Sequence, residues 1–153
     1  MSSSASPARR AGGNPRPAGP SYPGSRLGLP AEGVGAVAGW GRRILALCVD
    51  WLASLLVAAL LTGGASMSSR GWETWVPLMV FLAEASLLTP LLGGSFGQVA
   101  TRVAVMHTDG SPVSLLAAVV RTALICLVVP PVIYNYDRRG LHDLATGTVT
   151  IRR

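Results

Sequence analysis

Three ionisable side chains, Asp50, Glu84 and Arg121, each interrupt a long run of apolar residues. A carboxylate in such surroundings must be paired, protonated or hydrated, because leaving water costs several kcal/mol. Two neighbouring carboxylates tend to share a proton or a cation. Arg121 is the natural counter-ion for both acids if its segment packs against them. This pattern predicts either a proton or cation site or a buried charge network.

Arg43 lies seven residues before Asp50. On a helix this spacing puts both side chains on one face, about 10 Å apart along the axis. We therefore expect Arg43, Asp50, Glu84 and Arg121 to form a charge network or an ion pathway. A network would fix the register of the helices, whereas a pathway would use the acids as binding groups. The residues alone favour neither interpretation.

The sequence predicts no catalytic residues, no metal site and no cofactor, and hence no enzyme. No nucleophile and base stand in a recognisable arrangement, and Cys48 and Cys126 lie within apolar runs rather than loops. His107 and His142 lack metal-ligand spacing, and we expect His142 to be a polar surface residue. Residues 93–97 are glycine-rich but follow an apolar helix, which favours a membrane exit turn over a nucleotide-binding loop.

The composition indicates that these charges lie in a membrane. Half of the 153 residues are apolar, only 13% are charged, and the mean hydropathy is +0.45. About 20 apolar residues in a helix cross the roughly 30 Å hydrocarbon core. We predict an all-α membrane protein with transmembrane helices at about 44–61 and 75–92. A third, proline-broken helix at about 114–134 is predicted to span the membrane partly or fully.

The distribution of arginine helps to choose between these topologies. Pro130 and Pro131 interrupt the third segment, which either crosses as a kinked helix or enters and returns. With a cytoplasmic N-terminus, three full spans place seven arginines inside and five outside, whereas a returning segment places eleven inside and one outside. Because cytoplasmic loops carry an excess of arginine, we favour two full spans, a partly inserted third segment and two cytoplasmic termini.

Two further features flank the spans. Residues 102–107 and 148–152 alternate apolar with other residues, which predicts a short cytoplasmic β pair that must lie on one side of the membrane. Residues 1–39 hold 6 of the 11 prolines and 8 of the 18 glycines, so we predict a disordered tail ahead of a membrane domain at 40–153. The tail lacks the interleaved aromatic residues of a single-strand binder, and no nucleic acid is expected as a partner.

Four segments together resemble one family. Residues 43–50, RILALCVD, are similar to the first-span signature of the RDD family, which is named for one arginine and two aspartates. Residues 139–149, RGLHDLATGTV, resemble its carboxyl-terminal motif, in which Asp143 is the second aspartate. Residues 93–98, GGSFGQ, are similar to the glycine-rich segment after the second span, and Arg121 with the following threonine resembles the opening of the third.

The resemblance covers about residues 39–152 and implies a small integral membrane protein. Most members have no assigned activity, although sodium/proton exchange has been proposed for a few. The resemblance adds Asp143 to the charge network, where it would pair with Arg43 if the C-terminal segment folds back beneath the first span. Gln98 stands where a lysine is common, which removes a charge that could bind an anion.

Two functions are consistent with these observations. The first is a scaffold or regulatory component of the bacterial inner membrane, multi-pass with a cytoplasmic N-terminus, in which small residues of the first span, Ala53, Ser54, Ala58 and Ala59, pack closely against a neighbour. The alternative is an ion- or proton-coupled transporter. Three short segments cannot enclose a pathway, so this alternative requires a homo-oligomer or a membrane partner protein in addition to the lipid bilayer.

Overall fold

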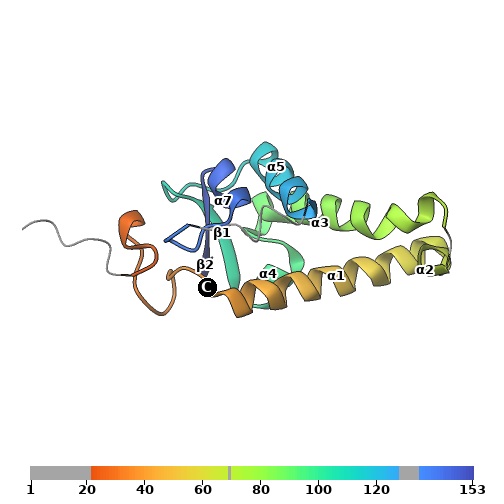
Figure 1. The fold of residues 1–153 in the computed structure, drawn as a ribbon, viewed down its shortest axis with the longest axis horizontal. Coiled ribbons are helices and arrows are strands. Elements are labelled where there is room, and N and C mark those ends of the chain that lie inside the picture. The colour runs from red at the N-terminus through yellow and green to blue at the C-terminus, as the bar shows by residue number, and fades with distance from the viewer. Residues whose placement is uncertain (1–21, 69, 128–134) are drawn as a thin grey trace, which may run out of the picture.

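A long helical hairpin and a small base that contains a two-stranded sheet make up the fold (Figure 1). This is a computed structural model, and it describes residues 22–68, 70–127 and 135–153. Its elements, in chain order, are η1 (Ser25–Leu27), α1 (Trp40–Thr62), α2 (Ala65–Ser68), η2 (Trp72–Trp75), α3 (Val76–Leu92), α4 (Phe96–Ala100), β1 (Val103–His107), α5 (Leu115–Cys126), α7 (Leu141–Ala145) and β2 (Thr148–Arg152).

The hairpin consists of α1 and α3, which correspond to the two spans predicted from the sequence. Two helical stretches, Trp40–Thr62 and Trp72–Leu92, are long and apolar enough to cross a membrane. Only 22% and 33% of their most apolar windows are buried within the protein. Large apolar side chains such as Leu52, Leu56 and Leu60 are instead exposed along α1. Such a surface is stable in lipid, whereas a soluble protein rarely exposes a large apolar patch.

Small residues spaced four apart form the buried face of α1. Ala46, Asp50, Ser54 and Ala58 are its buried residues, and α1 packs against α3 and α4. Because residues i and i+4 lie on one face of a helix, this spacing gives a narrow seam that lets the neighbouring backbone approach closely. Of the four residues predicted for such a face, Ser54 and Ala58 are buried, and Ala53 and Ala59 are only half-buried.

The base is built on an antiparallel pair of strands, β1 and β2, in the segments predicted to be strands. Val103 pairs with Arg152 and His107 with Thr148. Because β1 follows the hairpin and β2 ends the described chain, the pairing closes the fold at one end of the hairpin (Figure 1).

The prediction of a disordered tail through residue 39 is wrong for residues 22–39. Val37 forms an isolated bridge with Ile151, and the amide of Ala38 donates to the carbonyl of Thr150 at 2.9 Å. Residues 36–38 are buried. This segment carries few large apolar side chains, but backbone hydrogen bonds to the edge of β2 offset its ordering entropy. Residues 1–21 lie outside the described residues.

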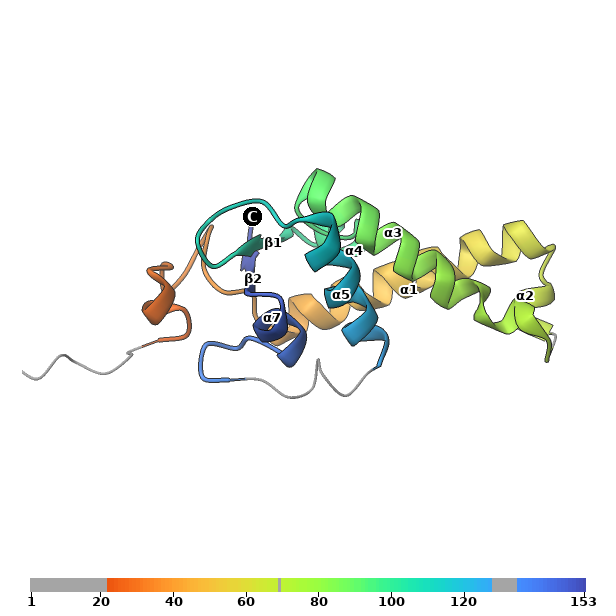
Figure 2. The same ribbon diagram turned by 90° about the horizontal axis from the view of Figure 1, so that it is seen from above.

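The third apolar segment is represented by α5, which has 12 residues. At 1.5 Å per residue it is about 18 Å long, well short of the roughly 30 Å hydrocarbon core. Ser114 precedes α5, and its side chain caps the N-terminus of the helix. The helix packs beside α3 near the base (Figure 2). Residues 128–134, which include the predicted proline break, lie outside the described residues.

Candidate functional site

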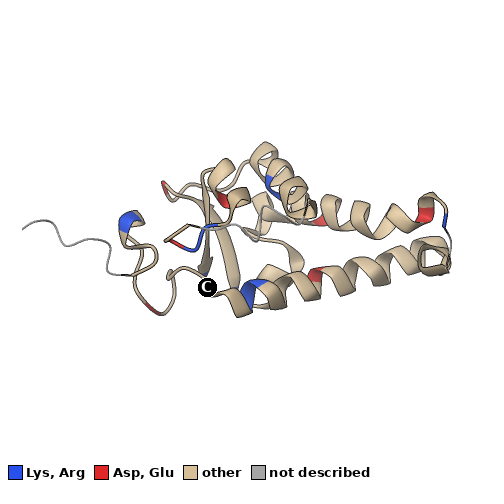
Figure 3. Ribbon diagram, in the orientation of Figure 1, with Lys and Arg blue, Asp and Glu red and all other residues tan. Residues whose placement is uncertain are grey.

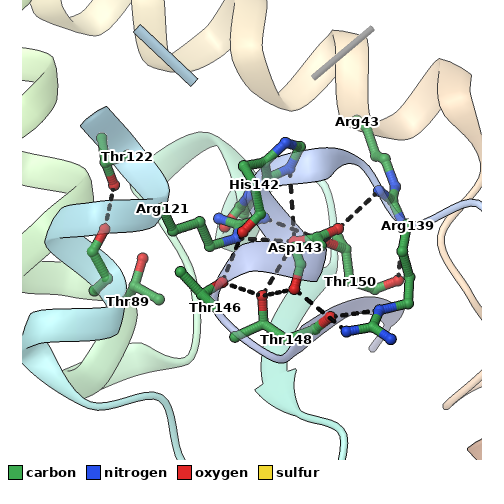
Figure 4. Close-up of polar contacts among 12 residues, drawn as sticks. Arg43, Thr89, Arg121, Thr122, Arg139, His142, Asp143, Thr146, Thr148 and Thr150 are labelled. Atoms are coloured by element: carbon green, nitrogen blue, oxygen red, sulfur yellow. Dashed lines mark hydrogen bonds and ion pairs between the residues drawn. The ribbon is translucent and has the colours of Figure 1, made fainter. Parts of the chain in front are cut away.

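Asp143 is the centre of a buried charge cluster in the base (Figure 4). Its side chain is fully buried, and Arg121 Nε lies 3.0 Å from Oδ1 while Arg43 Nη1 lies 3.2 Å from Oδ2. The hydroxyls of Thr148 and Thr150 donate to the same carboxylate at 3.3 and 3.2 Å. We call these five residues the Asp143 cluster. One carboxylate therefore joins four elements, α1, α5, α7 and β2.

The two arginines make further bonds that hold the same elements. Arg43 Nε donates to the carbonyl of Ala38 at 3.1 Å, and its Nη2 donates to the carbonyl of Thr150 at 3.3 Å. Arg121 Nη2 donates to the hydroxyl of Thr150 at 3.2 Å. Because a guanidinium has five N–H donors in a fixed plane, each arginine can bind the carboxylate and a strand together.

Opposing effects set the protonation of Asp143. Its complete burial raises the pKa of the carboxyl, but the charges of Arg121, His142 and Arg43 outweigh burial and lower the pKa to about 2. The carboxylate is thus ionised at neutral pH, with its charge balanced by the arginines rather than by water.

His142 is buried, so its prediction as a surface residue is wrong. Its Nε2 lies 3.5 Å from Asp143 Oδ1. The ring also packs onto Gly140, where an added Cβ would lie 2.5 Å from the ring. Gly140 has an extended backbone and directly precedes α7, whose His142 and Asp143 are both buried. The polarity of a histidine side chain gives no indication of this burial.

Asp50 and Glu84 lie together in a second site, at the N-terminus of α4. Asp50 accepts hydrogen bonds from the hydroxyl of Ser95 at 2.6 Å and from the backbone N–H of Gly97. Glu84 accepts from the backbone N–H of Phe96. The first N–H groups of a helix have no partner within it, and they favour negative charge. We call these five residues the Asp50 cluster.

The glycine-rich segment is what allows this contact. Gly97 lies so close to α1 that an added Cβ would collide with the carbonyl oxygen of Ala46 and approach the Asp50 carboxyl carbon at 2.9 Å. Ser95 and Gln98 form a capping box, in which each side chain binds the backbone N–H of the other. The segment predicted as an exit turn therefore also supplies the donors for the two acids.

The structure divides the five predicted site residues between the two clusters. Asp50 and Glu84 lie together, and Arg43 lies with Arg121 and Asp143. The prediction that Arg121 is the counter-ion of the two acids is wrong, because its guanidinium binds Asp143. Backbone N–H groups donate to the carboxylates of Asp50 and Glu84, whereas the donors to the Asp143 carboxylate among the described residues are side chains.

Sequence reasoning missed the residues that complete each cluster. Thr148 and Thr150 lie two apart on β2, so both side chains point to one face of the strand, and this alternation was a usable signal. Ser95 has the signature of a helix cap, since a glutamine follows it three residues later. Neither pattern indicates which carboxylate Thr148, Thr150 or Ser95 binds.

A cavity of about 100 Å³ lies between the two clusters. Its polar lining includes Asp50, Arg43, Arg121 and His142, and its apolar lining includes Phe81. In the hairpin, charged residues lie in the half nearer the base and again at the tip, where Arg70 and Glu73 stand, and the stretches of α1 and α3 between carry none (Figure 3). The arrangement can hold a polar or charged group against an apolar wall.

Comparison with known proteins gives one match. Neither the curated proteins nor the solved structures contain one that matches the chain. Residues 37–147, however, match the RDD family. That range includes both members of the Arg43–Asp143 ion pair, both spans and the glycine-rich segment between α3 and α4. Since the match covers most of the sequence, the chain belongs to the RDD family.

Proposed function

We propose that this protein is a multi-pass scaffold or regulatory component of the bacterial inner membrane, with no enzyme activity, and that its buried charges are structural. The observation that carries the proposal is that the protein itself satisfies its two most deeply buried carboxylates. Asp143 binds two arginines, and Asp50 binds a hydroxyl and a backbone N–H. Groups held in this way stabilise one packing of the helices rather than exchange with solvent.

The topology we propose has two full spans and both termini in the cytoplasm. Residues 36–38 bond to β2 immediately before α1 begins, and β1 pairs with β2 shortly after α3 ends. Both ends of the hairpin therefore lie on the side of the base. The helix α5 is too short to cross, and the chain on each side of it leads to a strand of that base. The excess of arginine in and around the base supports a cytoplasmic location for it.

The exposed apolar faces of α1 and α3 are proposed to contact lipid and one further membrane subunit, either a second copy or a partner protein. Leu56, Leu60 and Leu61 are each more than 60% exposed on α1, as are Met79 and Leu91 on α3. A bilayer covers such side chains at little cost, and close packing with another helix covers them equally well. A scaffold needs such a surface on the outside of a rigid hairpin.

Two observations favour the alternative, an ion- or proton-coupled transporter that acts as an oligomer. Asp50 lines the cavity between the clusters. In addition, the buried Oε2 atom of Glu84 has no hydrogen-bond partner among the described residues. An acid beside a cavity can bind and release a proton or a cation if a path connects it to both sides.

Reconstitution in vesicles separates the two functions. Proton and sodium fluxes are followed for the wild type, for Asp50→Asn, and for Asp109→Asn as a control at an exposed acid of the turn after β1. The scaffold function predicts the same leak-level flux from all three proteins. A wild-type flux well above the leak of empty vesicles, abolished in Asp50→Asn and kept in Asp109→Asn, would establish the transporter instead.

A further inference from the structure

The cavity between the two clusters presents opposite charges that are not paired with each other. Asp50 and Arg121 both line it and are only 3% and 4% exposed. Among the described residues no ion pair joins them. A buried cation and a buried anion that share a cavity without meeting leave room for a ligand that carries both charges.

The guanidinium of Arg121 can bind such a ligand. Its Nε donates to Asp143 and its Nη2 donates to Thr150, and the same side chain lines the cavity. A guanidinium has five N–H donors, so these two contacts do not use all of them. An oxyanion is the group that a guanidinium binds best.

An apolar cavity lies beside this one. A second cavity, of about 320 Å³, is lined by Leu47, Trp51, Leu78, Phe81, Ile125 and Cys126. Three of these residues, Leu47, Phe81 and Ile125, line the first cavity as well. The two neighbouring cavities, one with charged lining residues and one with an apolar lining, are together complementary to an amphiphile.

The position of the space along α1 is compatible with a lipid. Trp40, the first residue of α1, lines the cavity at the end of the span, where tryptophan is typical of the membrane interface. Asp50 follows ten residues later, about 15 Å further along the helix axis. The space thus extends from the interface into the hydrocarbon region.

We propose that this space binds a phospholipid whose head group carries a phosphate and a primary ammonium, as in phosphatidylethanolamine. The phosphate binds Arg121, the ammonium binds Asp50, and an acyl chain lies along the apolar cavity. A primary ammonium donates hydrogen bonds to a carboxylate, whereas the trimethylammonium of phosphatidylcholine has no N–H, and phosphatidylglycerol has no cation. The inference rests on the membrane placement proposed above.

Native mass spectrometry of the full-length protein tests this inference. The detergent-purified protein is offered an equimolar mixture of the three phospholipids with identical acyl chains. We expect about tenfold preferential retention of phosphatidylethanolamine, as the loss of one charged hydrogen bond from either competitor implies. Equal retention of all three lipids, or a preference for either competitor, would overturn the inference.

A pair of variants on α3 locates the site. Ala85 is buried and lines the cavity, so Ala85→Leu fills the space and is expected to lower retention of phosphatidylethanolamine about tenfold. Ala83 lies two residues earlier, is exposed and lines neither cavity, so Ala83→Leu is the matched control and should bind as the wild type does. Wild-type retention by Ala85→Leu would also overturn the inference.

Carbonate extraction separates this inference from the proposed function. Wild-type protein that remains in the membrane but retains the three lipids equally contradicts only the lipid site. Wild-type protein that is extracted into the soluble fraction contradicts the membrane placement and the lipid site together.

Discussion

The guanidinium of Arg43 lies 3.2 Å from the carboxylate of Asp143, although 100 residues separate them in the sequence. Arg43 stands in the first turn of α1 and Asp143 in the short helix before the last strand. The pair therefore fastens the beginning of the membrane domain to its end. Because Arg121 binds the other oxygen of the same carboxylate, the third apolar segment is held at the same point.

Removing the charge of Asp143 should destabilise the base. Asp143→Asn leaves Arg43 and Arg121 buried without a carboxylate, and breaking such a pair from one side costs about 3–5 kcal/mol. We expect strongly reduced accumulation in membranes and a lower melting temperature in detergent. Asp109→Asn, at an exposed turn, is the control and should change neither quantity. Wild-type stability of Asp143→Asn would show that the cluster does not hold the fold.

The same carboxylate predicts a loss of stability in acid. The pKa of Asp143 is lowered to about 2 in the folded protein, so between that value and its ordinary value near 4 the unfolded chain binds more protons. The contribution of about 2 kcal/mol is fully present above pH 4 and is lost as the pH falls through about 2. Thermal melts in detergent from pH 7 to pH 2 measure it. An Asp143→Asn protein that still folds should not show this loss of stability between about pH 4 and pH 2. If the variant shows the same loss, other groups cause it.

Adding a methyl group at Gly97 should separate α4 from α1. Gly97→Ala puts a Cβ against the carbonyl oxygen of Ala46, and overpacking of this kind costs about 1–3 kcal/mol. Gly41→Ala is the matched control, because Gly41 lies in α1 with nothing within 4 Å of an added Cβ. Alanine favours a helix by about 1 kcal/mol over glycine. Thermal melts should show a loss for Gly97→Ala and no loss for Gly41→Ala, and equal melting temperatures would contradict the close approach.

The segment ahead of α1 should be protected from hydrogen exchange. The amides of Gly35 and Ala38 donate to carbonyls of β2 at 2.9 Å, so they exchange only when this part of the base opens. Exchange measured by mass spectrometry should be slower there than in an unstructured peptide of the same sequence. Exchange at the peptide rate would restore the sequence-based prediction of disorder for these residues.

The parts of the fold that depend on local pattern were predictable. The length of the apolar runs predicted α1 and α3, and the alternation of apolar with other residues predicted β1 and β2. Both patterns can be read within a single segment, without knowledge of its tertiary partners. The small residues of the first span indicated the buried face of α1 in part, since Ser54 and Ala58 are buried on it. The family resemblance added Asp143 and its pairing with Arg43.

The parts that depend on tertiary partners were not predictable. Charge alone made Arg121 the counter-ion of Asp50 and Glu84, but backbone N–H groups of α4 serve these acids, and no sequence pattern assigns a backbone donor to a distant side chain. The burial of His142 depends on the close approach of its ring to Gly140, which has no side chain. Residues 35–38 bond to the edge of β2 that β1 leaves unpaired, and this edge forms only when the base folds. The order of residues 22–39 therefore depends on a tertiary partner.

The central claim, a membrane hairpin closed by a cytoplasmic base, is tested most directly by a reporter enzyme that is active only outside the cytoplasm. The reporter is fused after Arg153 in one protein and inserted at Gly71, near the tip of the hairpin, in another. We predict no activity from the fusion after Arg153 and high activity from the insertion at Gly71. High activity from the fusion after Arg153 would put the two ends of the domain on opposite sides of the membrane and contradict the account.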